Sequence, residues 1–374
     1  MSITARDRTT MLSKAPVGTV RARAFTIPTD APESDGTLEW KATTLVVAEA
    51  EAGGKTGLGW TYASKAAAGV IEETLAEAVI GVDALDVPRA WTEMVSKVRN
   101  LGSRGLAGCA ISALDGALWD LKARLLGLPL CDLLGRRRDE VEVYGSGGFT
   151  SYDERRLADQ LGEWTHEGGC AWVKMKVGRH PAEDPGRAKA AKKAIGKAQL
   201  FVDANGAYAL AQALEMANRF ADLNVGWFEE PVSSDDLSGL AFIRERAPAG
   251  MAIAAGEYGY EPFYFLRMLE AEAVDVLQAD ITRCWGITGF LMAADLAFAF
   301  NRPLSGHCAP AMHLHAACAA PNLRHLEWFH DHVRIEERLF EGAPKLKRGR
   351  IAPDLTRPGN GCDFRRADAE RFSA

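Results

Sequence analysis

The sequence lacks the features that identify several large classes of protein. Its 44 Lys and Arg against 50 Asp and Glu give a formal net charge of −6, which offers neither a basic surface for nucleic acid nor a cationic face for membranes. The longest apolar runs, such as residues 293–300, are too short to span a bilayer. The N-terminus shows no apolar stretch followed by a small-residue cleavage site. We therefore expect a cytoplasmic protein with no nucleic-acid or membrane partner.

Cysteine is also scarce and shows no pairing pattern. The seven cysteines are scattered, odd in number and never arranged as C-x-x-C. In a chain of 374 residues this pattern is typical of reduced, buried thiols and not of a disulfide framework. It also argues against a structural zinc site built on cysteine.

The chain is longer than one compact core usually accommodates, which predicts one large domain and a smaller one. Residues 18–62 have the pattern of antiparallel strands, with a turn at Gly53-Gly54. A helix with apolar residues at three- and four-residue steps follows at 109–126. We assign residues 1–135 to a small N-terminal α+β domain.

From residue 141 onward, strand-like runs alternate with amphipathic helices. Eight strand starts about 26 residues apart suit one strand, one helix and two short loops per unit. Eight such units favour an α/β fold with a closed (β/α)8-type barrel, which we assign to residues 136–330. Residues 331–374, which contain three prolines, are expected to return to the N-terminal domain. The predicted strands are 141–146, 172–177, 199–203, 226–229, 252–256, 274–279, 303–306 and 323–327.

Ionisable residues cluster at the C-terminal ends of these strands. Catalytic residues of (β/α)8 enzymes come from that end of the barrel, and a buried charge is costly unless it is paired or binds a metal. A period of two places Lys174 and Lys176 on one face of their strand, which is the interior because both faces of a barrel strand are covered. We therefore expect one shared site formed by Lys174, Lys176, Asp203, Glu229, Glu257, Asp280, His307 and Glu327.

Single members of this set have simpler interpretations. Asp203 alone could cap the following helix, and Glu229 and Glu257 could be ordinary carboxylates at the barrel rim. The two alternating lysines are harder to explain in this way. The whole set is harder still to explain by chance, so we favour the functional interpretation.

The residue types favour one kind of chemistry. Three carboxylates without cysteine favour a hard, oxygen-preferring cation, for which Mg²⁺ is the usual choice. Such an ion can stabilise the enediolate that forms when the α-proton of a carboxylate substrate leaves. Lys174 beside Lys176 supplies a like charge that should lower the pKa of Lys176 toward the roughly 7–8 that a base needs. His307 can meet Asp280, which would fix its tautomer.

Several short motifs follow one another along the chain. They are K-x-K at 174–176, DANG at 203–206, FEEP at 228–231, AAGE at 254–257, Asp280 in QADITRCWGITG, SGH at 305–307, and Glu327. This ordered set resembles the mandelate racemase branch of the enolase superfamily over nearly the whole chain. The resemblance implies a modified barrel with an N-terminal capping domain. It also implies a small-molecule carboxylate substrate and a homo-oligomer, although the number of subunits does not follow from the sequence.

The resemblance also assigns roles to individual residues. Lys176 would be one base, and His307 with Asp280 the opposing pair. Lys174 would contact the substrate carboxylate and tune Lys176, while Glu327 would hydrogen-bond the developing enediolate. One Mg²⁺ per site would be held by Asp203, Glu229 and Glu257, with Glu230 as a competitor for the position of Glu229. Contacts to substrate are expected from Asn205, Arg283, the capping stretch 28–40, and the segment around Trp60 and Tyr62.

The family contains both dehydratases and racemases that use these same groups. Two opposed bases can move a proton from one face of the substrate to the other, which would give a racemase or epimerase. Alternatively, His307 can protonate a departing β-hydroxyl, which would convert a sugar acid into a 2-keto-3-deoxy acid. The polar and acidic segment 29–36 suits a substrate with many hydroxyls, so we favour the dehydratase.

Two further hypotheses come from other classes. A zinc hydrolase would draw on the histidines between residues 313 and 332, but the predicted first strand carries no H-x-H motif. His313 and His315 belong to a helix-like segment, where side chains two residues apart diverge by roughly 200° and cannot readily share a metal. A carboxylate-binding protein without turnover would have lost a base or a metal ligand, and none of the expected residues is missing.

Overall fold

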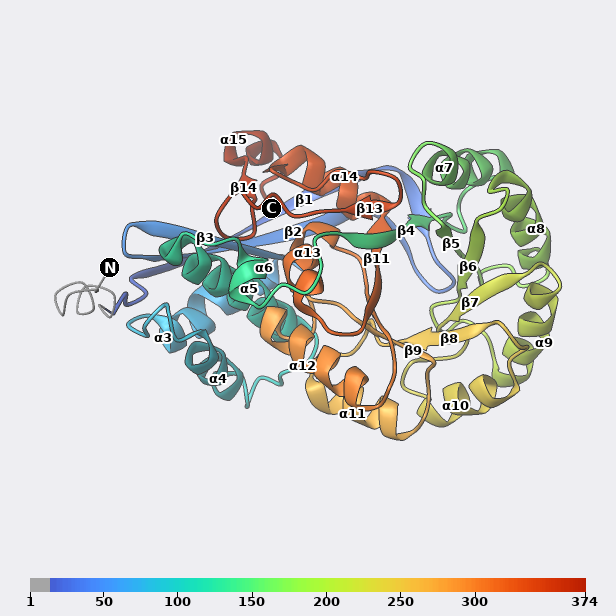
Figure 1. The fold of residues 1–374 in the computed structure, drawn as a ribbon, viewed down its shortest axis with the longest axis horizontal. Helices are drawn as coiled ribbons and strands as arrows, with labels where there is room; N and C mark the ends of the chain where they lie inside the picture. Colours follow the sequence, from blue (N-terminus) through green and yellow to red (C-terminus); the bar gives the residue numbers. More distant parts are fainter. Residues whose placement is uncertain (1–13) are drawn as a thin grey trace, which may run out of the picture.

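The computed structural model describes residues 14–374, so the first 13 residues of the predicted N-terminal domain lie outside the described part. A three-stranded antiparallel sheet lies beside a larger barrel whose helices form an outer ring (Figure 1). The small sheet has the order β1(Thr19–Ser34), β2(Glu39–Ala52), β3(Lys55–Tyr62). The predicted antiparallel strands and the turn at Gly53-Gly54 are therefore present.

Eight parallel strands form the barrel, and pairing of the last strand with the first closes it. The strands are β4(Val141–Gly147), β5(Trp172–Lys176), β6(Gln199–Asp203), β7(Val225–Glu229), β8(Ala252–Ala255), β9(Val276–Ala279), β10(Leu304–Gly306) and β11(Leu323–Phe329). The predicted (β/α)8-type barrel with an N-terminal antiparallel domain is confirmed. Each predicted strand coincides with an observed one to within two residues at either end.

A helix follows each barrel strand and packs on the outside. These helices are α7(Glu154–His166), α8(Asp184–Ala194), α9(Leu210–Ala221), α10(Leu237–Arg246), α11(Pro262–Glu270), α12(Gly286–Ala299), α13(Pro310–Ala319) and α14(His330–Leu339). The main apolar core lies between this ring and the outward side chains of the strands, such as Val173, Met175 and Val202. Because side chains alternate along a strand, the neighbouring residues Lys174 and Lys176 face the barrel interior.

Helix α5(Leu106–Leu126) joins the small sheet to the barrel. It is predicted to be amphipathic, but most of its residues are buried because β3 covers one side and α12 another. Close approach to β3 depends on two glycines: a Cβ added at Gly57 would lie 2.1 Å from the Ala117 carbonyl oxygen, and one at Gly59 would lie 2.2 Å from that of Ala113. The remaining short elements of this region are α2(Ala66–Val70), η1(Ile71–Leu75), α3(Ala76–Val79), α4(Val87–Lys97) and α6(Leu130–Leu133).

The C-terminal segment contacts both parts of the molecule. Strand β13(Arg350–Ile351) pairs with β4 of the barrel. The last residues reach β1, where the Ala374 N–H donates to the Ala24 carbonyl oxygen and Glu370 forms an ion pair with Arg23. The other elements here are β12(Phe340–Glu341), β14(Asp363–Phe364), α15(Arg366–Ala369) and η2(Glu370–Phe372).

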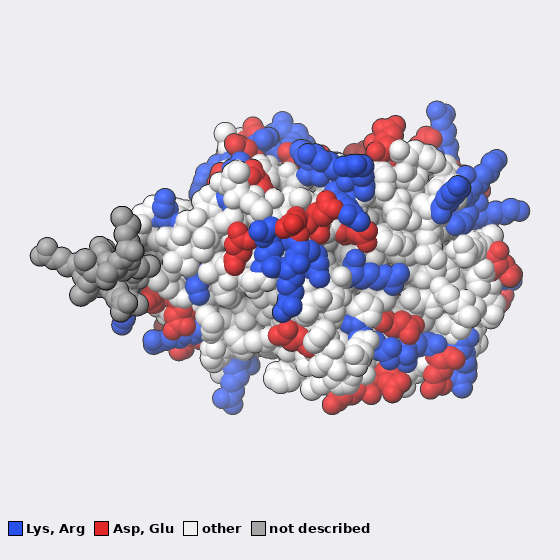
Figure 2. Space-filling model, viewed as in Figure 1, with Lys and Arg blue, Asp and Glu red and all other residues white. Residues whose placement is uncertain are grey.

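Positive and negative side chains are interspersed on the face drawn in Figure 2, with no single-signed field across it. Among residues 14–374, no helix combines the length and the apolar character that crossing a membrane requires. All seven cysteines are buried and unpaired, as the sequence predicts.

Candidate active site

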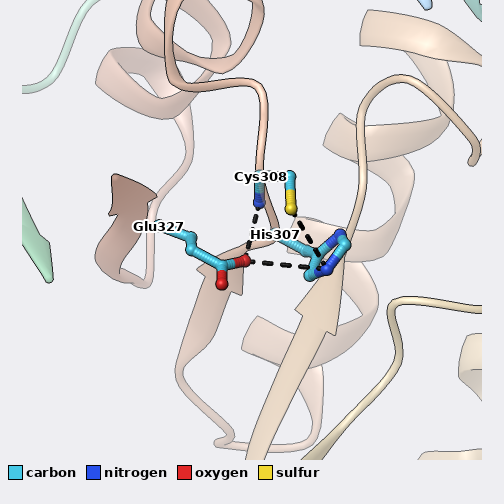
Figure 3. A group of neighbouring side chains, drawn as sticks. All are labelled: His307, Cys308 and Glu327. Atoms are coloured by element: carbon cyan, nitrogen blue, oxygen red, sulfur yellow. Dashed lines mark hydrogen bonds and ion pairs between the residues drawn. The ribbon is translucent and has the colours of Figure 1, made fainter. Parts of the chain in front are cut away.

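His307 follows β10 at the C-terminal mouth of the barrel and has a defined orientation (Figure 3). Its Nδ1 lies 2.8 Å from Asp280 Oδ2, and Asp280 is held in turn by the backbone N–H and hydroxyl of Thr282. The carboxylate accepts the Nδ1 proton, which leaves Nε2 directed toward other groups. Nε2 lies 3.1 Å from Glu257 Oε2, 3.3 Å from Cys308 Sγ and 3.6 Å from Glu327 Oε2. The structure thus brings His307 and Asp280 together as predicted.

The surroundings of His307 favour its protonated form. Burial by itself lowers the pKa of the imidazole, but the carboxylates of Glu257 and Glu327 and the hydrogen bond to Asp280 raise it well above the ordinary value. Asp280 shows the complementary effect, since the hydrogen bond from His307 and the charge of Arg283 outweigh burial and hold its pKa below the usual range. This pair can therefore deliver a proton as well as accept one.

Three buried carboxylates lie together at the ends of neighbouring strands. Asp203, Glu229 and Glu257 each offer an oxygen within 4.8 Å of the others. Strand register explains part of this arrangement, because Asp203 of β6 pairs with Glu229 of β7. Asp203 does not cap a helix: its Oδ1 accepts the Asn205 N–H, and α9 begins only at Leu210.

This group of oxygens fits a hard divalent cation. Burial, followed by the charge of the Asp203 carboxylate, raises the pKa of Glu229 to about 8, so a cation bound between these groups would stabilise the ionised form of Glu229. Glu257 Oε2 is buried and accepts no well-formed hydrogen bond. An all-oxygen donor set suits Mg²⁺. The neighbouring Glu230 is also buried, but the three oxygens that lie together include Glu229 and not Glu230.

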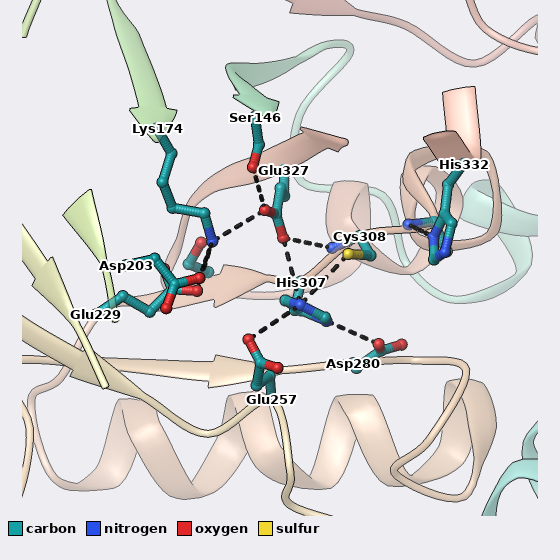
Figure 4. Close-up of polar contacts among 12 residues, drawn as sticks. Ser146, Lys174, Asp203, Glu229, Glu257, Asp280, His307, Cys308, Glu327 and His332 are labelled. Atoms are coloured by element: carbon teal, nitrogen blue, oxygen red, sulfur yellow. Dashed lines mark hydrogen bonds and ion pairs between the residues drawn. The ribbon is translucent and has the colours of Figure 1, made fainter. Parts of the chain in front are cut away.

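The two lysines of β5 form ion pairs with the buried carboxylates, and they share Asp203. Figure 4 shows the contacts of Lys174. Lys174 is fully buried, contacts Glu229, and lies 2.9 Å from Glu327 and 3.3 Å from Asp203. Lys176 lies 2.5 Å from Asp203, its partner in the β5–β6 register, and 3.1 Å from Asn205.

The expected lowering of the Lys176 pKa is wrong for this arrangement of side chains. Burial and the charge of Lys174 do lower the pKa of Lys176, but the Asp203 carboxylate, with smaller contributions from Glu257 and Glu229, raises it above the ordinary value. The carboxylate in direct contact outweighs the like charge two residues away because Coulomb energy grows as distance shrinks.

Glu327 of β11 is an acceptor of several hydrogen bonds in this structure. It accepts from the Ser146 hydroxyl at 2.5 Å and from the Cys308 N–H at 2.9 Å, and it forms the ion pair with Lys174. Burial alone would raise the pKa of Glu327, but Lys174 and His307 hold it below the usual range. Donation of a hydrogen bond to an enediolate, the role that the resemblance implies, would need a proton that these neighbours disfavour.

A cavity of about 400 Å³ opens between the barrel mouth and the small sheet. Lys176 and His307 both line it, as do the predicted contact residues Asn205, Arg283 and Tyr62. The small sheet also contributes Trp40, Thr43 and Thr44 of β2, and the segments next to its strands contribute Asp35, Leu38 and Ser64. Residues of both domains therefore enclose the same space.

The structure places Trp60, one of the predicted contact residues, away from the cavity. Trp60 is fully buried and packs on Phe340 at a ring distance of 4.4 Å, away from the residues that line the cavity. Tyr62, two residues later on the same face of β3, reaches the cavity and stacks on His332 at 3.5 Å. Trp60 therefore packs in the core of the protein, whereas Tyr62, nearer the end of β3, lines the cavity.

Several lining residues were not singled out as site residues from the sequence, among them Tyr258, Cys308 and His332. Tyr258 and Cys308 directly follow the predicted site residues Glu257 and His307, so adjacency to a strand end was the available signal. His332 lies just beyond β11 in the first turn of α14, where its Nδ1 accepts the Ala309 N–H.

The remaining buried histidines have structural partners. His313 and His315 lie on α13, as predicted, and accept hydrogen bonds from the N–H groups of Ile281 and Cys131. In the described part of the chain, the groups suited to hold a metal include neither of these two histidines. His330 belongs to one such group, with Asp30 and Glu33, but these residues do not line the cavity. No group among residues 14–374 holds two of the histidines between 313 and 332, so this geometry gives no support to the zinc-hydrolase hypothesis.

Comparisons with known proteins agree with this geometry. The family model described as mandelate racemase/muconate lactonizing enzyme, N-terminal domain, matches residues 26–135, and the one described as enolase C-terminal domain-like matches residues 156–369. A curated relative, L-talarate/galactarate dehydratase of Salmonella typhimurium, is 33% identical over 317 residues, which cover 82% of this chain and 77% of the relative.

Two solved structures have the same fold over nearly their whole length. A mandelate racemase/muconate lactonizing enzyme-like protein from Rubrobacter xylanophilus is 49% identical, with a TM-score of 0.94 and coverage of 96% of this chain and 100% of that one. A racemase from Streptomyces coelicolor with bound magnesium is 30% identical, with a TM-score of 0.89 and the same coverage.

Proposed function

The chain belongs to the mandelate racemase/muconate lactonizing enzyme family of the enolase superfamily, and from this premise we propose that it dehydrates a sugar acid to a 2-keto-3-deoxy acid with Mg²⁺ as its cofactor. One observation carries the proposal. Lys176 and His307 line one cavity beside the three carboxylates Asp203, Glu229 and Glu257. This arrangement would supply a base, an acid and a cation site to one bound substrate.

Asp203, Glu229 and Glu257 would hold the cation. When bound, Mg²⁺ supplies a Lewis acid that stabilises the negative charge developing on the substrate carboxylate. Lys174 adds a fixed positive charge next to Glu229 and Glu327. These residues together favour ionisation at the carbon next to the carboxylate.

Lys176 takes the α-proton in this proposal and must therefore be a neutral amine when substrate binds. Its ammonium is stabilised here by the Asp203 carboxylate, which also supplies one of the three oxygens assigned to the cation. Lys176 and the cation thus compete for Asp203. Loss of the Lys176 proton is coupled to cation binding for this reason.

His307 completes the dehydration from the other side. His307 lines the cavity and Asp280 holds its Nδ1, so in this proposal the imidazolium donates its Nε2 proton to the leaving β-hydroxyl. The raised pKa of His307 favours the protonated starting form that this step needs. A racemase would use His307 to return a proton to carbon instead.

The lining of the cavity supports a substrate with several hydroxyls. Thr44, Ser64 and Asn205 offer polar groups, and Arg283 offers a cation that can bind a second carboxylate or a hydroxyl. The relative from Salmonella typhimurium is a sugar-acid dehydratase by name, which supports the same choice.

Proton NMR in D₂O tests the proposal. The protein is incubated with Mg²⁺ and a panel of sugar acids, and a chelator-treated sample serves as the control. A 2-keto-3-deoxy product that depends on Mg²⁺ is the expected result. Deuterium incorporation with inversion and no new ketone would replace dehydration by racemisation. Absence of both for every acid of the panel would contradict the proposal.

A further inference from the structure

A second group of potential metal ligands lies beside the three carboxylates and contains a thiol. His307, Cys308 and Glu327 each offer one ligand atom within 4.8 Å of the others, and all three residues are buried (Figure 3). Cys308 has no role in the proposed dehydration. The group is therefore not explained by the site already described.

The distances in this group match a tetrahedral zinc site. Zn–S and Zn–N or Zn–O bonds of about 2.3 and 2.0–2.1 Å place neighbouring ligand atoms of a tetrahedron about 3.3–3.6 Å apart. Cys308 Sγ lies 3.3 Å from His307 Nε2, and Glu327 Oε2 lies 3.6 Å from the same nitrogen. Glu257 Oε2, 3.1 Å from Nε2, is within reach as a fourth ligand when it is not bound elsewhere.

The backbone fixes the thiol and the imidazole on the same side of the chain. Cys308 and Ala309 both have positive φ values, 52° and 39°, in the turn between β10 and α13. The Cys308 N–H donates to Glu327 Oε2, which ties this turn to the third ligand. The arrangement is preorganised, so a metal would not have to order a flexible segment.

Ligand chemistry separates this group from the three carboxylates. Thiolate and imidazole favour Zn²⁺ and similar thiophilic ions, whereas Mg²⁺ prefers oxygen. We propose that His307, Cys308 and Glu327 form an inhibitory site for a thiophilic divalent cation such as Zn²⁺ or Cd²⁺. The bound ion would occupy His307 Nε2 and so remove the acid on which turnover depends. The inhibition rests on the proposed function, whereas the metal site itself does not.

The free thiol is not a competing nucleophile. Burial, followed by the charge of Glu327, raises the pKa of Cys308 to about 12, so the sulfur remains a thiol. A metal that binds here displaces two protons to solvent, the thiol proton of Cys308 and the Nε2 proton of the His307 imidazolium, because both ligands bind metals only in their deprotonated forms.

Cadmium binding tests the site without any substrate. The full-length protein, saturated with Mg²⁺, is titrated with Cd²⁺ while the ultraviolet thiolate-to-cadmium charge-transfer absorption is recorded. We expect one equivalent to saturate the band. Cys308→Ser should abolish the band, whereas the matched variant Cys170→Ser, which alters another buried thiol, should retain it. A band that is absent from the wild type, or that survives in Cys308→Ser, would overturn the proposal.

A second variant keeps the test valid if Cys308→Ser does not fold. His307→Asn removes the imidazole ligand and leaves the thiol, and it should weaken Cd²⁺ binding by at least about 10–100-fold, the loss typical even of indirect changes at a metal site. Unchanged affinity would contradict the assignment of His307 as a ligand.

Zinc inhibition is measured once a substrate is known. Micromolar Zn²⁺ added to the Mg²⁺-loaded enzyme should inhibit the wild type and Cys170→Ser, and inhibition of Cys308→Ser should need at least about 10-fold more Zn²⁺. Equal inhibition of all three proteins would refute the regulatory claim. Failure to find any substrate would refute the proposed function alone, because the cadmium band reports the metal site directly.

Discussion

The two interior layers of the barrel contain opposite kinds of side chain, although the same strands supply both. On four strands a polar residue at the mouth lies two positions after an aromatic one: Ser146 after Tyr144, Asp203 after Phe201, Glu229 after Trp227, and Glu327 after His325. The upper layer carries the buried charges. The lower layer forms a cluster of rings with distances of 4.8–6.3 Å between centroids.

One histidine in each layer shows how the surrounding side chains change the pKa of an imidazole. His307 in the upper layer has carboxylates as neighbours, and they raise its pKa. His325 in the lower layer lies among Tyr144, Phe201 and Trp227; burial, followed by the charge of Arg324, holds its pKa well below the ordinary value. The same imidazole group is thus a charged participant in one layer and a neutral packing element in the other.

The layers are nevertheless connected by two contacts. Trp227 Nε1 donates to Glu229 Oε2 at 2.9 Å, and the Lys174 ammonium lies 5.5 Å from the centre of the Tyr144 ring. The aromatic layer therefore contacts the proposed metal ligands from below, while the charged layer contains the residues proposed to carry out the chemistry. Substitutions in the two layers should have separable effects on turnover and on stability.

Lys176→Met in the upper layer should produce the largest effect. Removal of the proposed base is expected to reduce kcat by about 10²–10⁴-fold or more, because no other amine lines the cavity in the described residues. The midpoint of thermal unfolding of the Mg²⁺-loaded protein should stay close to that of the wild type. Lys193→Met, on the exposed face of α8, is the matched control and should retain full turnover. Full activity of Lys176→Met would refute its role as the base.

Phe201→Ala in the lower layer should show the reverse pattern. Loss of a fully buried ring is expected to reduce the free energy of unfolding by about 3–5 kcal/mol. The fraction that remains folded should keep its kcat, since Phe201 does not line the cavity. Urea denaturation and kinetics at low temperature measure the two quantities. If the folded fraction of Phe201→Ala lost its kcat while its free energy of unfolding stayed close to that of the wild type, the proposed distinction between the layers would be contradicted.

Trp227→Phe tests the contact between the layers. The ring is largely kept, but Glu229 loses its indole N–H donor, so Mg²⁺ affinity should fall by about 10–100-fold. Isothermal titration calorimetry with Mg²⁺ measures this change. Trp172→Phe is the matched control, because Trp172 packs near His325 and no contact joins it to Glu229 in the described residues. Equal affinities in both variants would show that the indole hydrogen bond is dispensable.

His325→Gln should change how stability depends on pH. The pKa of His325 is lower in the folded protein than the roughly 6.5 of an unfolded chain. Below pH 6.5 the unfolded chain therefore binds a proton that the folded protein does not, and stability is lost as the pH falls. Protonation of His325 in the unfolded chain therefore lowers the free energy of unfolding of the wild type by about 1.4 kcal/mol per pH unit. The variant lacks this contribution. Urea denaturation at pH 7, 6 and 5 should show a shallower decline for His325→Gln; parallel curves would contradict the expectation.

Much of the barrel could be predicted from local patterns. Strand and helix periods placed all eight strands, and the period of two placed Lys174 and Lys176 inside. The ionisable residues at the strand ends converge because parallel strands of a closed barrel bring those ends to one mouth. The sequence pattern also identified the carboxylates that lie together, from Asp203 to Glu257.

Other properties depended on neighbours that the chain supplies from distant segments. The pKa of Lys176 follows from its register with Asp203 and not from the nearby Lys174. Trp60 and Tyr62 share a face of β3, but only docking of the small sheet on the barrel decides which of them reaches the cavity. The proximity of Cys308 to His307 and Glu327 similarly depends on a turn with positive φ values and on the pairing of β10 with β11.

The sequence by itself determined the barrel, its family and the set of ionisable groups at its mouth, because these features arise from short-range periodicity and from motifs within single strands. Only the tertiary structure decided which of those groups touch and which side chains of the small sheet enclose the cavity. The physical reason is that ion pairs, hydrogen bonds and metal sites depend on distances of a few ångströms between segments far apart in the chain, and strand register and domain docking set those distances.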